Sequence, residues 1–387
     1  MTEAASTRDQ HLFGPGPKRI LALDGGGTKG IIELAFLARI EALLREHMGG
    51  GPDFRLCDWF DLIGGTSTGA IIAAALALGK PVAEITQLYL DLAPLAFRSR
   101  GWRVAGFVSR FDAKPLIRFL HTQFGARSLD SHDLKTGLAV IAHRFDTGSP
   151  WLISNNPHAP YWADPADASY IGNRHYKLTD VVRASTAAPG YFEPQKLSVV
   201  PGCKPALFVD GGLSPHNNPS LMLLMLAHAK TFGLCWPVGP ENLSLISIGA
   251  GQYRRGYGMD KDPPRTAGLL AAHGLMQSLS SSQTQTLTML QWISEPMMPW
   301  QINSEIGTLA GEVLGGHALL GFQRYDLLLE EAWLQTTLGV KVDAKKLARL
   351  RRLDGPDSMP ELHAMATEAA ARQVRLEHLT GGQPAIL

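Results

Sequence analysis

The sequence predicts an α/β fold of three layers, in which helices cover both faces of a mostly parallel central sheet. Two observations lead to this expectation. Residues 19–23 and 60–63 are short apolar runs typical of buried strands, and each is followed by a glycine-rich turn and then by a segment with helical spacing of apolar residues. Strand–turn–helix units in succession imply parallel strands, because a parallel pair needs a crossover connection, usually a helix.

The predicted elements follow one another without an internal repeat. The first unit joins the strand at 19–23 to a helix at 31–44, and the second joins the strand at 60–63 to a helix at 70–78. Further strands are expected at 137–143, 151–154, 206–209 and 243–248, and further helices at 219–230, 269–293, 344–352 and 360–378. Beyond residue 322 the chain is expected to be helical and charged.

Composition narrows the class of protein. The chain has 387 residues, 45% of them hydrophobic and 18% charged, with a formal net charge of +1. This balance argues against binding DNA or RNA, which are bulk polyanions, so anionic partners must bind at local patches. The cysteines, Cys57, Cys203 and Cys235, are too far apart in sequence for a zinc motif or a disulfide framework. We therefore expect a reduced, cytoplasmic protein without a metal site.

The chain divides into three predicted parts. Residues 1–17 form a polar, flexible leader without the apolar core of a secretory signal, residues 18–340 a catalytic domain, and residues 341–387 a helical C-terminal appendage. The longest apolar stretches, 70–78 and 221–229, are about half the length needed to cross a bilayer. If the protein acts on lipid, it is expected to bind peripherally, at the inner face of the membrane.

The first candidate site is Gly65-Thr-Ser-Thr-Gly69, which matches the G-x-S-x-G turn between a strand and a helix. Glycines are needed there because a side chain would collide with the neighbouring strand or helix. Ser67 would stand at a helix N-terminus, where the local dipole favours developing negative charge. The pattern predicts a nucleophilic serine, and the alternative is a turn whose glycines only permit close packing.

The second candidate is Asp24-Gly-Gly-Gly-Thr-Lys-Gly30, between the first strand and its helix. Successive glycines allow several backbone N–H groups to point into one cavity, which is what stabilising a tetrahedral oxyanion requires. Gly25, Gly26 and Gly27 are therefore predicted to form an oxyanion hole. The same loop geometry would also suit a phosphate group.

The third candidate is Asp210, at the end of the apolar run 206–209 and followed by Gly211 and Gly212. An aspartate at the carboxyl end of a strand can face the same sheet edge as Ser67 and accept its proton. Partial burial would raise the pKa of such a carboxyl group and improve it as a base at neutral pH. The alternative interpretation is a turn-forming Asp-Gly pair.

Together these three elements resemble the patatin-like phospholipase family, whose pattern has a D-G-G-G-x-[RK]-G loop, a G-x-S-x-G serine and a D-G-[GA] aspartate in this order. Two softer features agree with it: Ala184-Ser-Thr-Ala-Ala-Pro-Gly-Tyr-Phe192 and Asn217-Asn-Pro219. The resemblance covers about residues 18–250. It implies a patatin-like fold, a Ser67–Asp210 dyad without histidine, no cofactor for the chemistry, and hydrolysis of carboxylic esters of phospholipids. Lys29 stands where relatives more often carry arginine.

Within this family, the chain is similar to the cyclic-nucleotide-activated phospholipases of anti-phage defence, so the resemblance implies a cyclic dinucleotide activator and a homo-oligomer. Two basic and aromatic segments could bind its phosphates, through Arg98, Arg100 and Arg103 in one and Arg254 and Arg255 in the other. Either segment could instead meet anionic lipid head groups or be a solvated loop.

Two rival interpretations remain open on the sequence. D-G-G-G-T-K is also the phosphate loop of sugar kinases with the actin-like ATPase fold, where it bends a β-hairpin, but helical spacing follows it here. A histidine triad in the order Ser, Asp, His is the other, with His216, His228 and His273 as candidates after Asp210.

Overall fold

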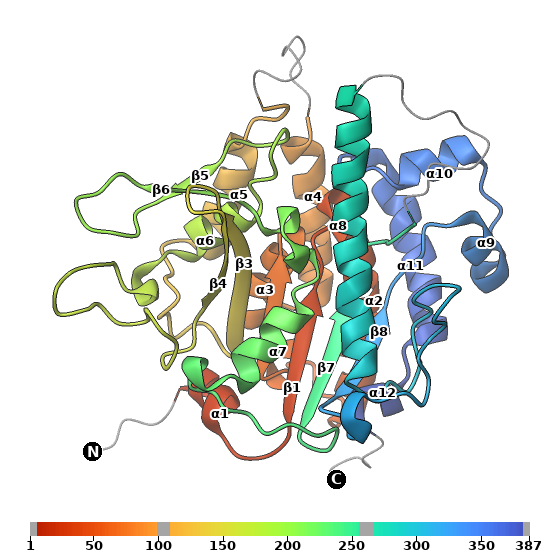
Figure 1. Ribbon diagram of the computed structural model, residues 1–387, viewed down its shortest axis with the longest axis horizontal. Helices are drawn as coiled ribbons and strands as arrows, with labels where there is room; N and C mark the ends of the chain where they lie inside the picture. Colours follow the sequence, from red (N-terminus) through yellow and green to blue (C-terminus); the bar gives the residue numbers. More distant parts are fainter. Residues whose placement is uncertain (1–5, 99–108, 255–266, 382–387) are drawn as a thin grey trace.

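Within residues 6–98, 109–254 and 267–381, which the computed structural model describes, eight strands form one mixed sheet in the order β5-β6-β3-β2-β1-β7-β8, with β4 paired to β3 (Figure 1). The run β3-β2-β1-β7-β8 is parallel throughout, and β4, β5 and β6 pair antiparallel with their neighbours. The strands are β1 (Lys18–Leu23), β2 (Leu62–Thr66), β3 (Gly137–Arg144), β4 (Ser149–Ser154), β5 (Gln195–Leu197), β6 (Ala206–Asp210), β7 (Leu243–Ile248) and β8 (Gly321–Tyr325). The predicted fold class, with its mostly parallel sheet, is confirmed.

The central strands are buried on both faces, which explains their continuous apolar sequences. In β1, Ile20 and Ala22 face one helical layer while Leu21 and Leu23 face the other. Helices α1, α7 and α8 supply the first layer, and α2, α3, α4, α6 and α11 contribute to the second. The helices are α1 (Thr7–Phe13), α2 (Gly30–His47), α3 (Thr68–Ala77), α4 (Val82–Ala96), α5 (Lys114–Phe124), α6 (Leu178–Ser185), α7 (Ser220–His228), α8 (Ala267–Trp292), α9 (Glu331–Trp333), α10 (Ala344–Leu350), α11 (Met359–Gln373) and α12 (Leu376–Thr380).

The leader expected at residues 1–17 contains a helix, α1, in the part that the structure describes. The Ser6 hydroxyl caps α1 by accepting the Asp9 amide, and Leu12 is buried against the sheet. The Trp236 indole also donates to the Leu12 carbonyl at 2.9 Å. The His11 ring also lies 2.9 Å from the Asp61 carboxylate, so α1 is tied to the body of the protein by both apolar and polar contacts.

Two strands were not predicted. β5 has three residues, too few to show a period of two. β8, with the sequence GFQRY, lies where the chain was expected to turn helical, and it places Gln323 and Arg324 in the interior. Buried polar side chains hide the apolar pattern by which a core strand is recognised from sequence.

The C-terminal helices share the main core. Leu362, Ala366 and Ala369 of α11 are buried in the same hydrophobic cluster as the apolar side chains of α2. The hydrophobic core is thus continuous across residue 341. The expected domain boundary at that residue stays a prediction.

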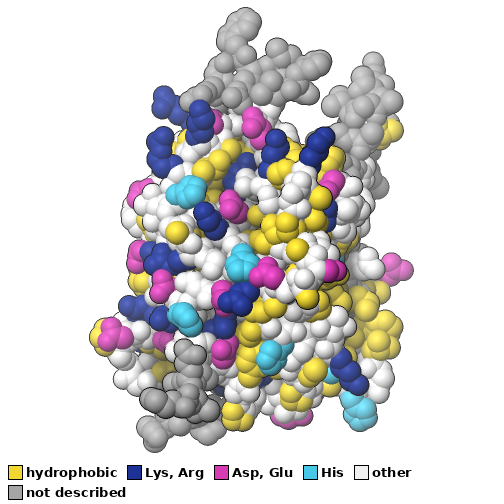
Figure 2. Space-filling model, turned by 90° about the vertical axis from the view of Figure 1, so that its left-hand side faces the viewer, with side chains coloured by type: hydrophobic (Ala, Val, Ile, Leu, Met, Phe, Trp, Pro, Cys, Tyr) yellow, Lys and Arg dark blue, Asp and Glu magenta, His cyan; other side chains and the backbone are white. Residues whose placement is uncertain are grey.

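The surface fits the balanced composition. Figure 2 shows one face of the molecule, on which Lys and Arg side chains alternate with Asp and Glu among the described residues. In the part of the chain that the structure describes, no helix combines the length and the apolar character needed to cross a bilayer.

Candidate active site

Ser67 lies at the sharp turn between β2 and α3, at the carboxyl edge of the sheet. Its φ of +55° and ψ of −121° are unusual for a residue with a side chain. Such a conformation costs about 1–3 kcal/mol and persists only where the surroundings impose it. Strained residues of this kind concentrate at functional sites, and this turn places the serine at the N-terminus of the buried helix α3.

The two glycines of the motif have the steric role predicted from sequence. A Cβ on Gly65 would lie 2.2 Å from the Gly69 carbonyl oxygen, and one on Gly69 would lie 2.5 Å from the carbonyl oxygens of Leu23 and Asp24. The turn therefore packs directly on the glycine-rich loop that follows β1. This close approach brings two segments that are separated in sequence to one site.

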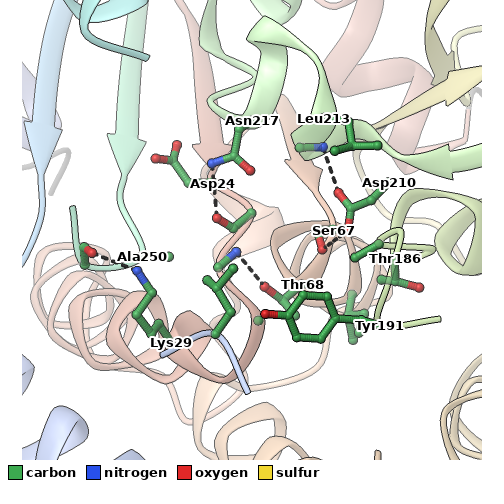
Figure 3. Close-up of a pocket in the computed structure, with 18 of the residues that line it drawn as sticks. Asp24, Lys29, Ser67, Thr68, Thr186, Tyr191, Asp210, Leu213, Asn217 and Ala250 are labelled. Carbon is green, nitrogen blue, oxygen red and sulfur yellow. Dashed lines mark hydrogen bonds between the residues drawn. The ribbon is translucent and has the colours of Figure 1, made fainter. Parts of the chain in front are cut away.

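Asp210 ends β6, and its side chain points toward Ser67 (Figure 3). The Ser67 hydroxyl donates a hydrogen bond of 2.6 Å to Asp210 Oδ2, while the Gly212 amide donates one of 2.7 Å to Asp210 Oδ1. The first bond is the contact that a serine nucleophile and its base require. The second fixes the carboxylate in the orientation that makes this contact.

Burial raises the pKa of Asp210 to about 6, and the hydrogen bonds from Ser67 and Gly212 and the positive charge of Arg183 oppose this shift. The carboxyl group thus remains mostly ionised at neutral pH. A base works best when its pKa lies close to the working pH. The environment of Asp210 moves its pKa in that direction.

Ser185, which sequence reasoning did not single out, holds the nucleophile turn in place. Its hydroxyl accepts the Ser67 amide at 2.8 Å and donates to the Ile141 carbonyl at 2.6 Å. The serine therefore ties the turn to β3. The signal in the sequence was the segment 184–192, which the family resemblance had already marked.

The glycine-rich loop passes beside Ser67, but its three amides differ. The Gly25 amide donates to the Asn217 carbonyl at 3.1 Å, and the Asn217 side chain donates back to the Gly25 carbonyl at 3.1 Å. The Gly26 amide donates to Thr68 Oγ1 at 3.1 Å (Figure 3). The Gly27 amide has no hydrogen-bond partner among the described residues. The Gly25 amide is thus bonded to Asn217 in this structure, and an oxyanion role for Gly25, Gly26 and Gly27 stays a prediction.

The Lys29 side chain ties the glycine-rich loop to the segment that follows β7. Its side chain is buried, and its ammonium group donates to the Gly251 carbonyl at 2.8 Å. This bond is to a single carbonyl oxygen, which an ammonium group satisfies without the planar fork of arginine. Lysine can therefore make this hydrogen bond in place of the arginine that relatives more often carry.

A pocket with a volume of about 250 Å³ opens onto Ser67 and Asp210. Much of its wall is apolar and comes from α3, α4, α5 and the segment after α6, with Ile71, Leu92, Ala96, Phe97, Leu116 and Phe192 among its lining residues. Ser67, Thr68 and Asp210 supply polar groups to the same pocket. The arrangement can hold an apolar chain with a polar group at the reacting atom.

A histidine triad is not formed in the described part of the chain. His216 contributes its backbone carbonyl, which accepts the Thr66 hydroxyl at 2.8 Å, and the His228 ring lies 2.9 Å from the Trp236 carbonyl oxygen. The side chain of His273 lies outside the described residues. Ser67 contacts Asp210 directly, so this geometry favours the dyad.

The arginines proposed for an activator are only partly described. Arg98 lines a surface groove between α4 and α5, together with Arg118 and Phe119. Arg254 is exposed, and its backbone amide donates to the Glu330 carboxylate at 2.8 Å. Arg100, Arg103 and Arg255 lie outside the described residues. Neither described arginine is among the residues that line the Ser67 pocket.

Gly26→Val tests the role of the loop. A Cβ at Gly26 would lie 2.2 Å from the Ala250 Cβ, so a side chain must displace the loop and the amides beside Ser67. Loss of an oxyanion donor costs about 10²–10³ in kcat, and we expect a loss of this size in ester hydrolysis. Gly51→Val is the matched control, because Gly51 has open space around it. Equal activity of the two variants would contradict an oxyanion role for the loop.

The fold and the site have the form expected of a serine hydrolase whose base is a carboxylate. Residues 21–224 match the model of the patatin-like phospholipase family, and the chain belongs to this family. The family resemblance of the motifs is thereby confirmed. The sugar-kinase alternative was wrong, because the glycine-rich loop leads through a short 3-10 turn into α2 and forms no hairpin.

Curated relatives agree with the family. A cGAMP-activated phospholipase of Escherichia coli (strain TW11681) is 34% identical over 215 residues, which are 54% of this chain and 55% of that protein. A cUMP-AMP-activated phospholipase of Escherichia coli is 32% identical over 61% of this chain and 65% of its own length. Patatin-16 of Solanum tuberosum is 29% identical over 60% of each chain. This chain therefore spans between about half and two thirds of the length of these relatives.

Proposed function

We propose that this protein is a lipid acyl hydrolase of the phospholipase A type, with Ser67 as nucleophile and Asp210 as general base. The observation that carries the proposal is the 2.6 Å hydrogen bond from the Ser67 hydroxyl to Asp210, at the floor of a largely apolar pocket. Membership of the patatin-like phospholipase family supports the same reaction.

The reaction would proceed in two steps at this dyad. In the first, Ser67 Oγ attacks the ester carbonyl while its proton passes to Asp210 Oδ2, and the leaving alcohol then takes that proton. In the second, water gives a proton to Asp210 as its oxygen attacks the acyl-serine, and Asp210 then returns that proton to Ser67 Oγ as the bond to the acyl group breaks and the fatty acid leaves. No histidine and no metal ion has a role in this scheme.

The glycine-rich loop would stabilise the negative oxygen that forms in both steps. The Gly26 amide is the nearest candidate donor, because its present acceptor is the hydroxyl of Thr68, the residue after the nucleophile. A developing oxyanion is a stronger acceptor than a neutral hydroxyl. The substrate oxygen would therefore replace Thr68 Oγ1 as the partner of this amide in the transition state.

The apolar wall of the pocket favours a fatty acyl chain over a short polar acyl group. Burial of methylene groups contributes about 0.8 kcal/mol each, so a chain of several carbons supplies the binding energy for the ester. We propose membrane phospholipid as the substrate, met by a protein bound peripherally to the inner face of the membrane. Leu213, at the pocket and 39% exposed, is a suitable contact for lipid.

Mass spectrometry of the products from a mixed phospholipid extract tests this proposal. The wild type should release free fatty acids and lysophospholipids, because hydrolysis breaks a carboxylic ester. Phosphorylated head groups or diacylglycerol as the main products would instead indicate cleavage at the phosphate and would contradict the assignment.

We further propose that a cyclic dinucleotide activates the enzyme. Two of the relatives carry this activation in their names, one by cGAMP and one by cUMP-AMP. A cytoplasmic phospholipase threatens its own membrane, so a resting state with low activity is physically sensible. Moving such an equilibrium from 1:99 to 99:1 needs about 5.5 kcal/mol of preference for the active form. Arginine–phosphate pairs and stacked bases are candidates to supply it, and Arg98 and Arg254 are the described arginines to test.

A panel of cyclic dinucleotides added to liposomes and enzyme tests this regulation. We expect low basal hydrolysis, strong stimulation by one member of the panel, and an increase in particle mass by light scattering if a homo-oligomer forms. Arg98→Ala should weaken binding of that member in calorimetry, while Arg174→Ala, which removes an arginine paired with Asp130 away from both pockets, should not. Full activity without nucleotide, together with no binding by any member, would contradict the regulation but not the dyad.

A further inference from the structure

A fully buried arginine connects the glycine-rich loop to the last strand of the sheet. Arg324 of β8 is 0% exposed, and its two terminal nitrogens donate to the two carboxylate oxygens of Asp24 at 3.0 and 2.7 Å. Asp24 is the first residue of the loop, directly before Gly25. The contact is therefore a bidentate ion pair between segments 300 residues apart in sequence.

The guanidinium is itself held in position. It donates to the carboxylate of Asp326 at 3.0 Å and to the Ser247 hydroxyl at 2.8 Å. Asp326 in turn accepts the amides of Gly251 and Leu327, both at 2.8 Å. Gly249 leaves the space, since a Cβ there would lie 2.3 Å from the guanidinium. Arg324 is thus part of a rigid frame on β7 and β8.

A second side chain, from α8, also binds the Asp24 carboxylate. Gln283 donates to Asp24 Oδ2 at 2.8 Å, in addition to the two hydrogen bonds from Arg324. Burial raises the pKa of Asp24 to about 6 and the charge of Arg324 opposes this shift, which keeps the group mostly ionised at neutral pH. Burial, and then the negative charge of Asp24, raise the pKa of the neighbouring Glu33 well above its usual range.

Asp24 does not act on Ser67 directly, because its carboxylate points away from the Ser67–Asp210 pair (Figure 3). We propose that Arg324 is a positioning residue, which clamps Asp24 to β8 and so fixes the loop amides beside Ser67. Both Arg324 and Gln283 lie outside residues 21–224, the region matched by the family model. The site is therefore completed by residues of the C-terminal half of the chain. The expected effect of Arg324 on turnover rests on the proposed function, whereas its expected effect on the position of the loop amides does not.

Hydrogen–deuterium exchange tests the positioning without any substrate. Arg324→Lys keeps the charge but loses the planar fork, so it cannot bind both oxygens of Asp24 in the same geometry. We expect amides in peptides covering residues 24–30 to exchange about tenfold faster, as expected for a loss of local stability near 1.4 kcal/mol. Gln283→Leu should give a smaller acceleration in the same peptides. Wild-type exchange of this loop in Arg324→Lys would overturn the proposal.

Kinetics test the consequence. Because a shift of about 1 Å at a catalytic group can cost about a hundredfold, Arg324→Lys should lower kcat about 10- to 100-fold with KM within about twofold. Leu12→Ala is the control for lost stability. Leu12 is buried, and its helix α1 lies at the end of the sheet opposite the carboxyl edge that carries Ser67, so this variant should leave kcat unchanged (Figure 1). A faster loop with unchanged kcat would overturn the catalytic role. No hydrolysis by the wild type, either alone or with any member of the cyclic dinucleotide panel, would refute the proposed function, and the exchange result would still decide the positioning.

Discussion

Ser67→Ala is expected to abolish ester hydrolysis while the protein stays folded. The substitution removes the oxygen that would form the acyl-enzyme, and loss of a catalytic serine costs about 10⁶-fold in kcat. Its side chain makes one hydrogen bond, to Asp210, so the melting temperature should change little. Product release from phospholipid, followed by mass spectrometry, measures the loss.

A fluorophosphonate probe gives an independent readout of the same residue. It should label Ser67 in the wild type and in the control Ser169→Ala, whose serine is exposed in a loop and does not line the Ser67 pocket. Labelling that persists in Ser67→Ala would place the nucleophile elsewhere.

Asp210→Asn is expected to lower kcat about 10⁴-fold, the loss seen when a catalytic aspartate becomes its amide. The amide has nearly the same shape but cannot accept the serine proton. His216→Ala, His228→Ala and His273→Ala should each retain most of the activity. A loss of several orders of magnitude in one of these histidine variants would favour a triad.

The pH dependence of the wild type should report the same carboxyl group. With the pKa of Asp210 raised to about 6, the base is protonated below that pH and ionised above it. We expect kcat/KM to rise about tenfold per pH unit below 6 and to level off above it. A profile that is flat from pH 4.5 to 7 would contradict Asp210 as the base.

The contact between Ser67 and Asp210 could be predicted from sequence because both residues follow apolar strands and are flanked by glycines with a steric reason to be there. A Cβ added to Gly65 or Gly69 would lie within 2.5 Å of backbone atoms, so the motif requires glycine at both positions for a steric reason. The same reasoning predicted the central strands, because both faces of these strands carry apolar side chains.

The supporting residues could not be predicted, because each acts through a partner that is distant in sequence. Ser185 matters only because the chain brings it to the Ser67 amide, and Arg324 only because β8 lies beside β7. A buried arginine also removes the apolar signal from its own strand. The position of the glycine-rich loop beside Ser67 could be predicted, but its hydrogen bonds could not, since the bond from Gly25 to Asn217 depends on a turn 192 residues away.

The position of β1 has a consequence for protein engineering. It lies in the middle of the sheet, with β2 on one side and β7 on the other, although β7 and β8 fall outside the family-matched region. A gene fragment cut at residue 224 would encode both dyad residues, yet it would leave one edge of β1 without a neighbour and Asp24 without its arginine. An unpaired apolar edge invites association with other chains. A fusion protein that uses this chain should therefore include β7, β8 and Asp326, together with α11, which shares the core with α2.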